Sequence, residues 1–73
     1  MGDTVTTFRM YYADKATICM AVMRDTWYEV IFNRRPVAVL VMNGEMEWML
    51  AGGTILPDEI VDEIGYRIES RYM

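Results

Sequence analysis

The sequence predicts an α+β domain in which a five-stranded antiparallel β-meander carries one C-terminal amphipathic α-helix on one face. Residues 5–50 contain short runs of β-branched and aromatic residues separated by turn residues, which is typical of strands. After Gly52-Gly53 the apolar residues recur at helical spacing. At 73 residues the chain has room for one hydrophobic core, so we expect residues 1–73 to form a single domain.

Five strands are expected in the first part of the chain. Asn43-Gly44 stands between two alternating runs and predicts a two-residue hairpin turn, because both residue types tolerate the positive φ of a type I′ turn. The other separators are too short for a parallel crossover, so every neighbouring pair is expected to be antiparallel. The predicted strands span residues 5–12, 17–23, 27–32, 37–42 and 45–50.

One amphipathic helix is expected over residues 57–71. Pro57 suits the first helical position. The acidic residues that follow it are stabilising there, because the N-terminal end of the helix dipole is positive. Glu63 and Arg67 form a favourable i,i+4 pair. Gly65 lies on or beside the buried stripe, where glycine costs helix stability, and we expect it to allow a close approach to the sheet. The apolar stripe consists of Ile60, Val61, Ile64, Ile68 and Tyr72.

The turns also predict which side chains share a face of the sheet. Turns assumed at Asp14-Lys15, Arg34-Arg35 and Asn43-Gly44 fix the register of the facing residues. One face is then almost wholly apolar and is expected to form the core beneath the helix. The side chains expected there are Tyr28, Val30, Phe32, Val37, Val39, Val41, Met46, Trp48 and Leu50.

The opposite face is also rich in apolar side chains, and one helix cannot cover both faces. Such a patch exceeds what a soluble monomer usually leaves in water, which predicts a homodimer through this uncovered face. Charged side chains are expected at its rim or paired across it, namely Arg9, Glu29, Glu45 and Glu47. The predicted interface residues are Ile18, Met20, Val22, Trp27, Ile31, Leu40, Met42 and Met49.

Composition argues against several classes of function. Eleven acidic residues against seven basic ones give a net charge of −4, which would repel a phosphate backbone, so no nucleic-acid partner is expected. Histidine is absent, and Cys19 lies mid-strand, where it packs as a small apolar side chain. The eight methionines suit a core or contact surface better than a copper site. We therefore predict no catalytic residue, metal or cofactor, and disfavour an enzyme.

The sequence predicts a cytoplasmic protein without a membrane partner. No apolar run is long enough to span a bilayer, and the N-terminus lacks the basic and apolar segments of a signal peptide. The single cysteine allows no internal disulfide, which favours a reducing compartment. Gly2 matches the loose N-myristoylation pattern, but no second signal for stable anchoring accompanies it.

Three functional hypotheses follow. The leading one is a small acidic protein-interaction module that acts as a homodimer. The second is a small-molecule binder or weak enzyme with a cleft between helix and sheet, lined by Gly52, Gly53, Trp48 and Tyr28. The third is a regulatory or inhibitory protein whose acidic helix face mimics nucleic acid, which requires the acids to form one dense patch.

Overall fold

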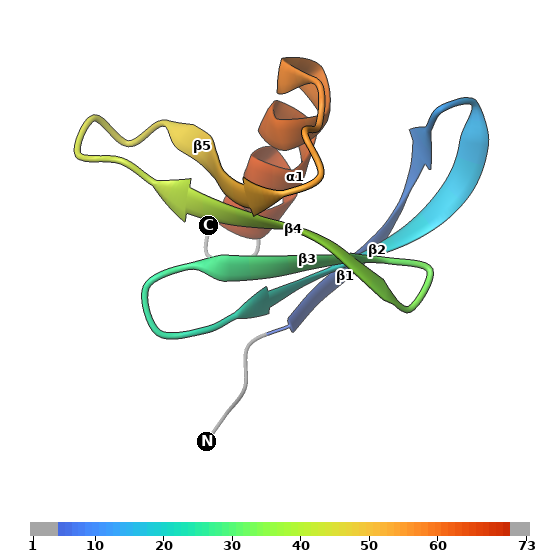
Figure 1. Ribbon diagram of the computed structural model, residues 1–73, viewed down its shortest axis with the longest axis horizontal. Helices are drawn as coiled ribbons and strands as arrows, with labels where there is room; N and C mark the ends of the chain where they lie inside the picture. Colours follow the sequence, from blue (N-terminus) through green and yellow to red (C-terminus); the bar gives the residue numbers. More distant parts are fainter. Residues whose placement is uncertain (1–4, 71–73) are drawn as a thin grey trace.

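The structure is a computed structural model that describes residues 5–70, and it shows one antiparallel sheet followed by one helix (Figure 1). The strand order is β1-β2-β3-β4-β5, so the predicted α+β meander with a C-terminal helix is confirmed. Gly2, the last expected helical residue Arg71, and Tyr72 of the expected apolar stripe lie outside the described residues. The elements are β1 (Val5–Tyr12), β2 (Lys15–Met23), β3 (Tyr28–Phe32), β4 (Arg35–Met42), β5 (Trp48–Gly53) and α1 (Asp58–Ser70).

Two tight turns lie at the same end of the sheet. Ala13-Asp14 joins β1 to β2 with φ of 54° and 63°, and Asn33-Arg34 joins β3 to β4 with φ of 49° and 72°. Positive φ at both central residues is the geometry of a type I′ turn, whose twist matches that of the flanking strands. Each turn begins one residue earlier than expected. This displacement leaves the faces of β1, β2 and β3 as predicted.

A β-bulge changes the register of β4. Val30 pairs with Ala38 and Ile31 pairs with Pro36, so Val37 is an extra residue with no partner of its own on β3. One extra residue reverses which face each later side chain occupies. The alternation predicted for β4 is therefore wrong beyond the bulge.

The reversal moves Leu40 and Ala38 into the core and places Val39 and Val41 on the opposite face. Leu40 was expected in a dimer interface, but its side chain is fully buried beneath α1. Met42 pairs with Trp48, which also packs on the helix side, so Met42 likewise does not lie on the uncovered face.

The turn between β4 and β5 is longer than the two-residue turn expected at Asn43-Gly44. The backbone N–H of Asn43 donates to the carbonyl of Glu47 at 2.9 Å, and Met46 N–H donates to Asn43 O at 3.1 Å. Asn43 Oδ1 also accepts hydrogen bonds from the backbone N–H groups of Glu45 and Glu47, at 2.8 and 2.9 Å. Met46, expected in the core, instead has a φ of 64° and is 75% exposed.

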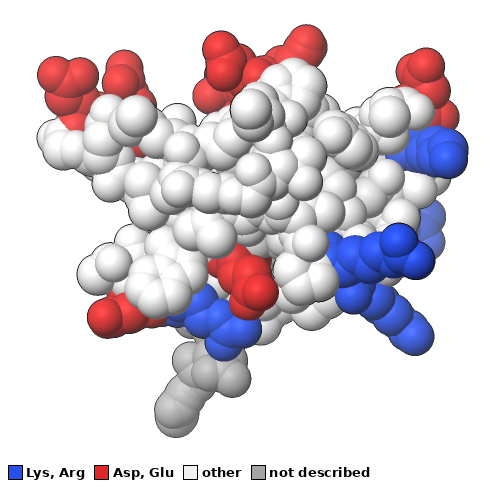
Figure 2. All heavy atoms as spheres, viewed as in Figure 1, with Lys and Arg blue, Asp and Glu red and all other residues white. Residues whose placement is uncertain are grey.

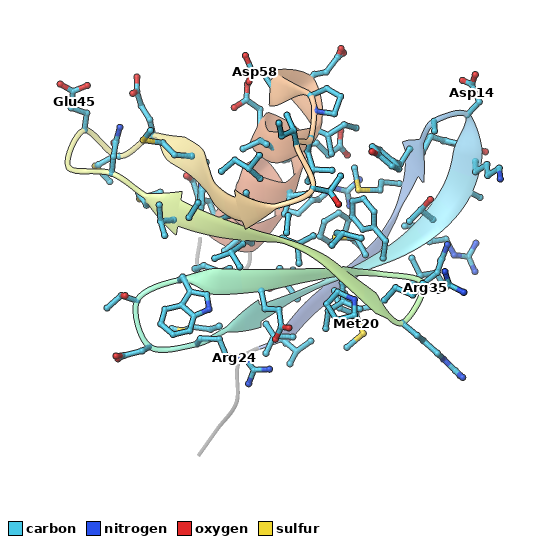
Figure 3. The ribbon with its side chains drawn as sticks, in the orientation of Figure 1. Asp14, Met20, Arg24, Arg35, Glu45 and Asp58 are labelled. Atoms are coloured by element: carbon cyan, nitrogen blue, oxygen red, sulfur yellow. The ribbon has the colours of Figure 1, made fainter. Side chains whose placement is uncertain are left out.

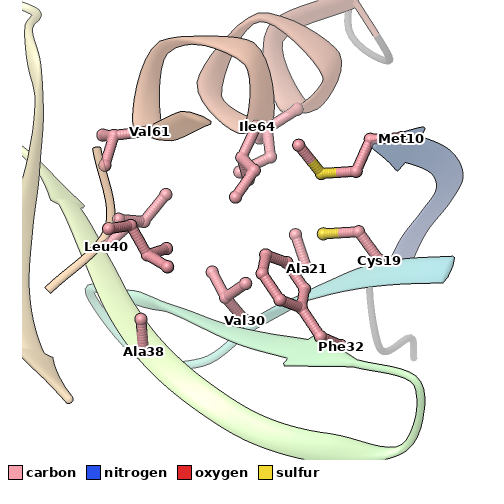
Figure 4. Close-up of a cluster of buried hydrophobic side chains, with 11 residues drawn as sticks. Met10, Cys19, Ala21, Val30, Phe32, Ala38, Leu40, Val61 and Ile64 are labelled. Carbon is pink, nitrogen blue, oxygen red and sulfur yellow. The ribbon is translucent and has the colours of Figure 1, made fainter. Parts of the chain in front are cut away.

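The helix lies in the hollow of the curled sheet, between β5 and the raised β1–β2 hairpin (Figure 1). It contacts both edge strands, β1 and β5. Its first N–H bonds, from Ile60 and Val61, are accepted by Pro57 O, so the helix begins one residue after the expected start. The predicted Glu63–Arg67 pair is present at 3.5 Å. Figure 4 shows the core between helix and sheet, formed by Met10, Cys19, Ala21, Val30, Phe32, Ala38, Leu40, Val61 and Ile64 with their neighbours.

Gly65 lies where α1 meets the indole ring of Trp48. A Cβ atom built on Gly65 would overlap this ring, so only glycine fits without a shift of the indole. Trp48 is held in place from two sides: its Nε1–H donates to Glu69 Oε2 at 2.7 Å, and Tyr28 packs edge-on with ring centroids 5.5 Å apart. The prediction that Gly65 permits a close approach of helix and sheet is confirmed.

We predict that Gly65→Leu lowers the free energy of unfolding by about 1–3 kcal/mol, because the new side chain would overpack the Trp48 contact. Chemical denaturation followed by tryptophan fluorescence measures this change. The control is Tyr66→Leu, which introduces leucine at the next helical position, where the side chain is 65% exposed. Equal stability of the two variants would show that Gly65 does not carry a tight contact.

We predict that Met46→Gly raises the free energy of unfolding by about 0.5–1 kcal/mol, since glycine adopts positive φ without the steric cost of a Cβ atom. Met46→Ala keeps that cost and is expected to leave stability nearly unchanged. Thermal denaturation of the two variants separates the backbone effect from the loss of the methionine side chain. Stabilisation by alanine to the same extent would contradict this explanation.

Candidate functional site

The sheet face opposite α1, which we call the outer face, is not covered by any described element. Cross-strand partners on it are Met20 with Ile31 and Val41 with Met49. In Figure 3, Met20 lies below the strands while α1 lies above them. The apolar residues of the outer face are Ile18, Met20, Val22, Ile31, Pro36, Val39, Val41 and Met49.

Five of the eight predicted interface residues lie on the outer face. Ile18 and Met49 are about half exposed, at 49% and 48%, and Met20 and Ile31 are half-buried between their neighbours. Val22 has the same orientation but keeps only 9% of its surface exposed. Trp27 lies in the turn between β2 and β3, at the end of the outer face, and is 39% exposed. Leu40 and Met42 are the two that the bulge places on the helix side.

Val39 and Val41 belong to the outer face, and sequence reasoning missed them. Both are half-buried rather than covered by the helix. The residue that could have revealed the error is Pro36, because proline within a strand is mostly found at an edge or a bulge. The outer face therefore carries an apolar row that continues through the central strand β4 to Met49 on β5.

The charges of the outer face are few and partly neutralised. Arg24 Nη2 lies 2.6 Å from Glu29 Oε1, and Arg24 Nε also donates to this oxygen at 3.2 Å. Arg9, opposite Ile18, stands on the edge strand β1. Glu29 lies between Val22 and Val39 on the face, so the apolar side chains surround a charge that Arg24 neutralises.

The cleft expected between helix and sheet is filled by the protein itself around Gly65, and a hollow stays open between β5 and the start of α1. The Trp48 ring fills the space against Gly65 and contacts Tyr28. Gly52 and Gly53 belong to β5, and Gly53, with φ of 87°, brings its backbone against that of Val37 and Ala38. These four expected cleft residues therefore serve strand pairing and helix packing in the structure.

The acidic side chains visible in Figure 2 stand in separate groups with neutral surface between them. Figure 3 locates two of these groups at Glu45, in the β4–β5 turn, and at Asp58, where α1 begins. Within residues 5–70, no three acidic or cysteine side chains are arranged to hold a metal ion. The view does not show the single dense acidic patch that the third hypothesis requires.

Cys19 lies in the core, with no exposed surface. Burial raises the pKa of its thiol from 9.0 to about 12, because the thiolate would lose its hydration. The thiol is therefore protonated and shielded near neutral pH, which suits packing rather than nucleophilic chemistry.

We predict a pH-dependent loss of stability caused by Cys19. Between pH 9 and 12 the unfolded chain releases the thiol proton while the folded protein retains it, so stability falls as pH rises. The contribution of one such group reaches about 1.4 kcal/mol per pH unit. Urea denaturation of wild type and Cys19→Ala across this range tests the effect, since other groups titrate in both proteins. Parallel curves for the two proteins would contradict a buried thiol.

Comparison with known proteins gives no match to any family model, and no significant match to a curated protein or a solved structure. Helix α1 has 13 residues and is too short and too polar to cross a bilayer. Within residues 5–70, no helix is long and apolar enough to do so.

Proposed function

We propose that the protein is a small interaction module that forms a homodimer through its outer face. The observation that carries the proposal is the set of apolar side chains from Ile18 through Met20 and Ile31 to Val41 and Met49, which crosses β2, β3, β4 and β5. The one acidic side chain among them in the described strands, Glu29 on β3, is paired with Arg24. Contiguous apolar patches of this kind mark interaction sites on soluble proteins. Methionine and isoleucine anchors with charges at the margin also match the composition of interface centres.

Charge favours a second copy of this chain as the occupant. Lys15, Arg34 and Arg35 lie at the end of the sheet that carries the two tight turns, with Asp14 as the neighbouring acid. Glu45 and Glu47 lie in the β4–β5 turn at the other end. Figures 2 and 3 show this polarity, with basic side chains gathered near Arg35 and Glu45 at the far side.

A two-fold axis in the plane of the outer face and perpendicular to the strands places opposite ends of the two copies over one another. The apolar side chains then meet in the centre, and the basic end of each copy lies over the acidic end of its partner, with Lys15, Arg35 and Glu47 on the sides of the two sheets turned away from the contact. An isologous contact of this kind is self-complementary and closes at two subunits. The charges contribute orientation and association rate more than affinity, which comes from the apolar centre.

We predict that sedimentation equilibrium at tens of micromolar gives the mass of two chains. Met20→Glu and, separately, Ile18→Glu should each raise the dimer dissociation constant by about tenfold or more, because a carboxylate would be buried in the apolar contact. Ile18 is half exposed, so its substitution tests the contact with little effect on the monomer fold. Far-UV circular dichroism checks that both variants fold.

The matched control is Ile55→Glu, which changes an apolar residue that is 85% exposed and lies between β5 and α1, away from the outer face. It should leave the dimer intact. A monomeric wild-type protein would overturn the proposal. A dimer that survives both outer-face substitutions would overturn it as well, since the contact would then lie at a strand edge or on the helix.

A further inference from the structure

An open hollow lies at the basic end of the sheet, on the side that faces α1 but beyond the cover of the helix. It has a volume of about 470 Å³ and extends from the β1–β2 turn to the β3–β4 turn. This volume falls within the range of small-molecule sites, about 300–1,000 Å³. The residues that line it are Tyr12, Ala13, Lys15, Ala16, Thr17, Phe32, Asn33, Arg35 and Val37.

The floor of this hollow is aromatic and apolar. The rings of Tyr12 and Phe32 lie in a tilted contact, with centroids 5.1 Å apart. Val37, the extra residue of the β4 bulge, lies beside them. Phe32 keeps 6% of its surface exposed and Tyr12 is half-buried, so the floor belongs to the ordered core rather than to a loose loop.

Two cations border the hollow, Lys15 on β2 and Arg35 on β4. Each stands directly across from a floor residue, because Lys15 pairs with Tyr12 and Arg35 pairs with Phe32. Within the described residues, neither cation lies within 4.0 Å of a carboxylate oxygen. Their charges are therefore available to a ligand.

The other hollows have the opposite character. The one between β5 and the start of α1, about 410 Å³, is bordered by Glu47, Asp58 and Asp62. The one along the exposed helix face, about 480 Å³, is bordered by Glu59, Asp62 and Glu63, with Arg67 paired to Glu63. Of these three hollows, the one at the basic end of the sheet favours an anion.

An adjoining hollow of about 360 Å³ shares Tyr12 and Ala13 with the basic one and continues along Pro57 and Ile60 of the helix start. Glu59 stands at its far side. If an anionic group of a ligand lies in the basic hollow, the rest of that ligand extends into this adjoining one. A second negative group there would be repelled by the Glu59 carboxylate, whereas an apolar tail would contact Pro57 and Ile60. The combined shape thus suits a ligand with one anionic end and one apolar end.

We propose that this end of the sheet binds small monocarboxylates with an aryl or alkyl tail. The carboxylate lies between Lys15 and Arg35, which donate charge-assisted hydrogen bonds, and the tail covers Tyr12 and Phe32. The site uses the face that α1 partly covers. It therefore lies on the opposite side of the sheet from the proposed dimer contact, although Lys15 and Arg35 also belong to the basic end of the sheet.

The test is a titration of the full chain with 4-phenylbutyrate, followed by two-dimensional ¹H–¹⁵N NMR. We expect the largest amide shifts at Ala13, Thr17 and Asn33, which border the hollow, and small shifts at outer-face residues such as Met49. The neutral analogue 4-phenylbutyramide should bind at least about fivefold more weakly, because it lacks the charge that the two cations recognise.

Lys15→Met and Arg35→Gln should each weaken 4-phenylbutyrate binding about three- to fivefold. The matched control is Arg34→Gln, which removes the neighbouring cation that does not border the hollow and should change binding less than twofold. Absence of shifts at millimolar ligand would overturn the proposal. Equal binding of the amide, an equal effect of Arg34→Gln, or shifts confined to the outer face would each overturn it too.

Discussion

The close contact between the Trp48 indole and the bare backbone at Gly65 determines how the helix and the sheet fit together. It fixes one edge of the sheet, because Trp48 is the first residue of β5 and also bonds to Glu69. At the other edge, the Arg67 guanidinium lies 5.2 Å from the ring centre of Phe8 on β1. Held at both edges, the sheet curls around α1 and buries the residues of its central strands.

This curl gives the two faces of the sheet different surfaces. The inner face is filled by the helix in its middle and is open at the basic end, where Tyr12 is half-buried and Phe32 keeps 6% of its surface exposed. No element within residues 5–70 covers the outer face, which spreads its apolar side chains over four strands. The single helix of the described chain thus leaves two surfaces uncovered, one broad and apolar, the other small and cationic.

The element types and their order could be predicted from the sequence, because hydrophobic period and turn residues are local properties. The alternation of side chains along β1, β2 and β3 also predicted correctly which of them lie on each face of the sheet. The faces of β4 could not be predicted in this way, because residues 37–42 are apolar at every position and so fit the core in either orientation. The prediction of a two-residue turn at Asn43-Gly44 was wrong for another reason. The Asn43 side chain accepts hydrogen bonds from two backbone N–H groups and so stabilises a longer turn. The position of the outer-face side chains was therefore predicted on β2, β3 and β5, and it was wrong on β4, where Val39 and Val41 take the places expected for Leu40 and Met42.

The position of α1 in the chain has a consequence for the order of folding. All four strand pairings join neighbours in sequence, so each hairpin closes a short loop. Only the helix brings distant segments together, as where Arg67 meets Phe8. During synthesis the five strands leave the ribosome before residues 58–70 do, and until then the inner apolar side chains have nothing to pack against. Completion of the core is thus delayed until the last described element emerges, and a nascent chain that stalls before it presents apolar surface on both faces of the sheet.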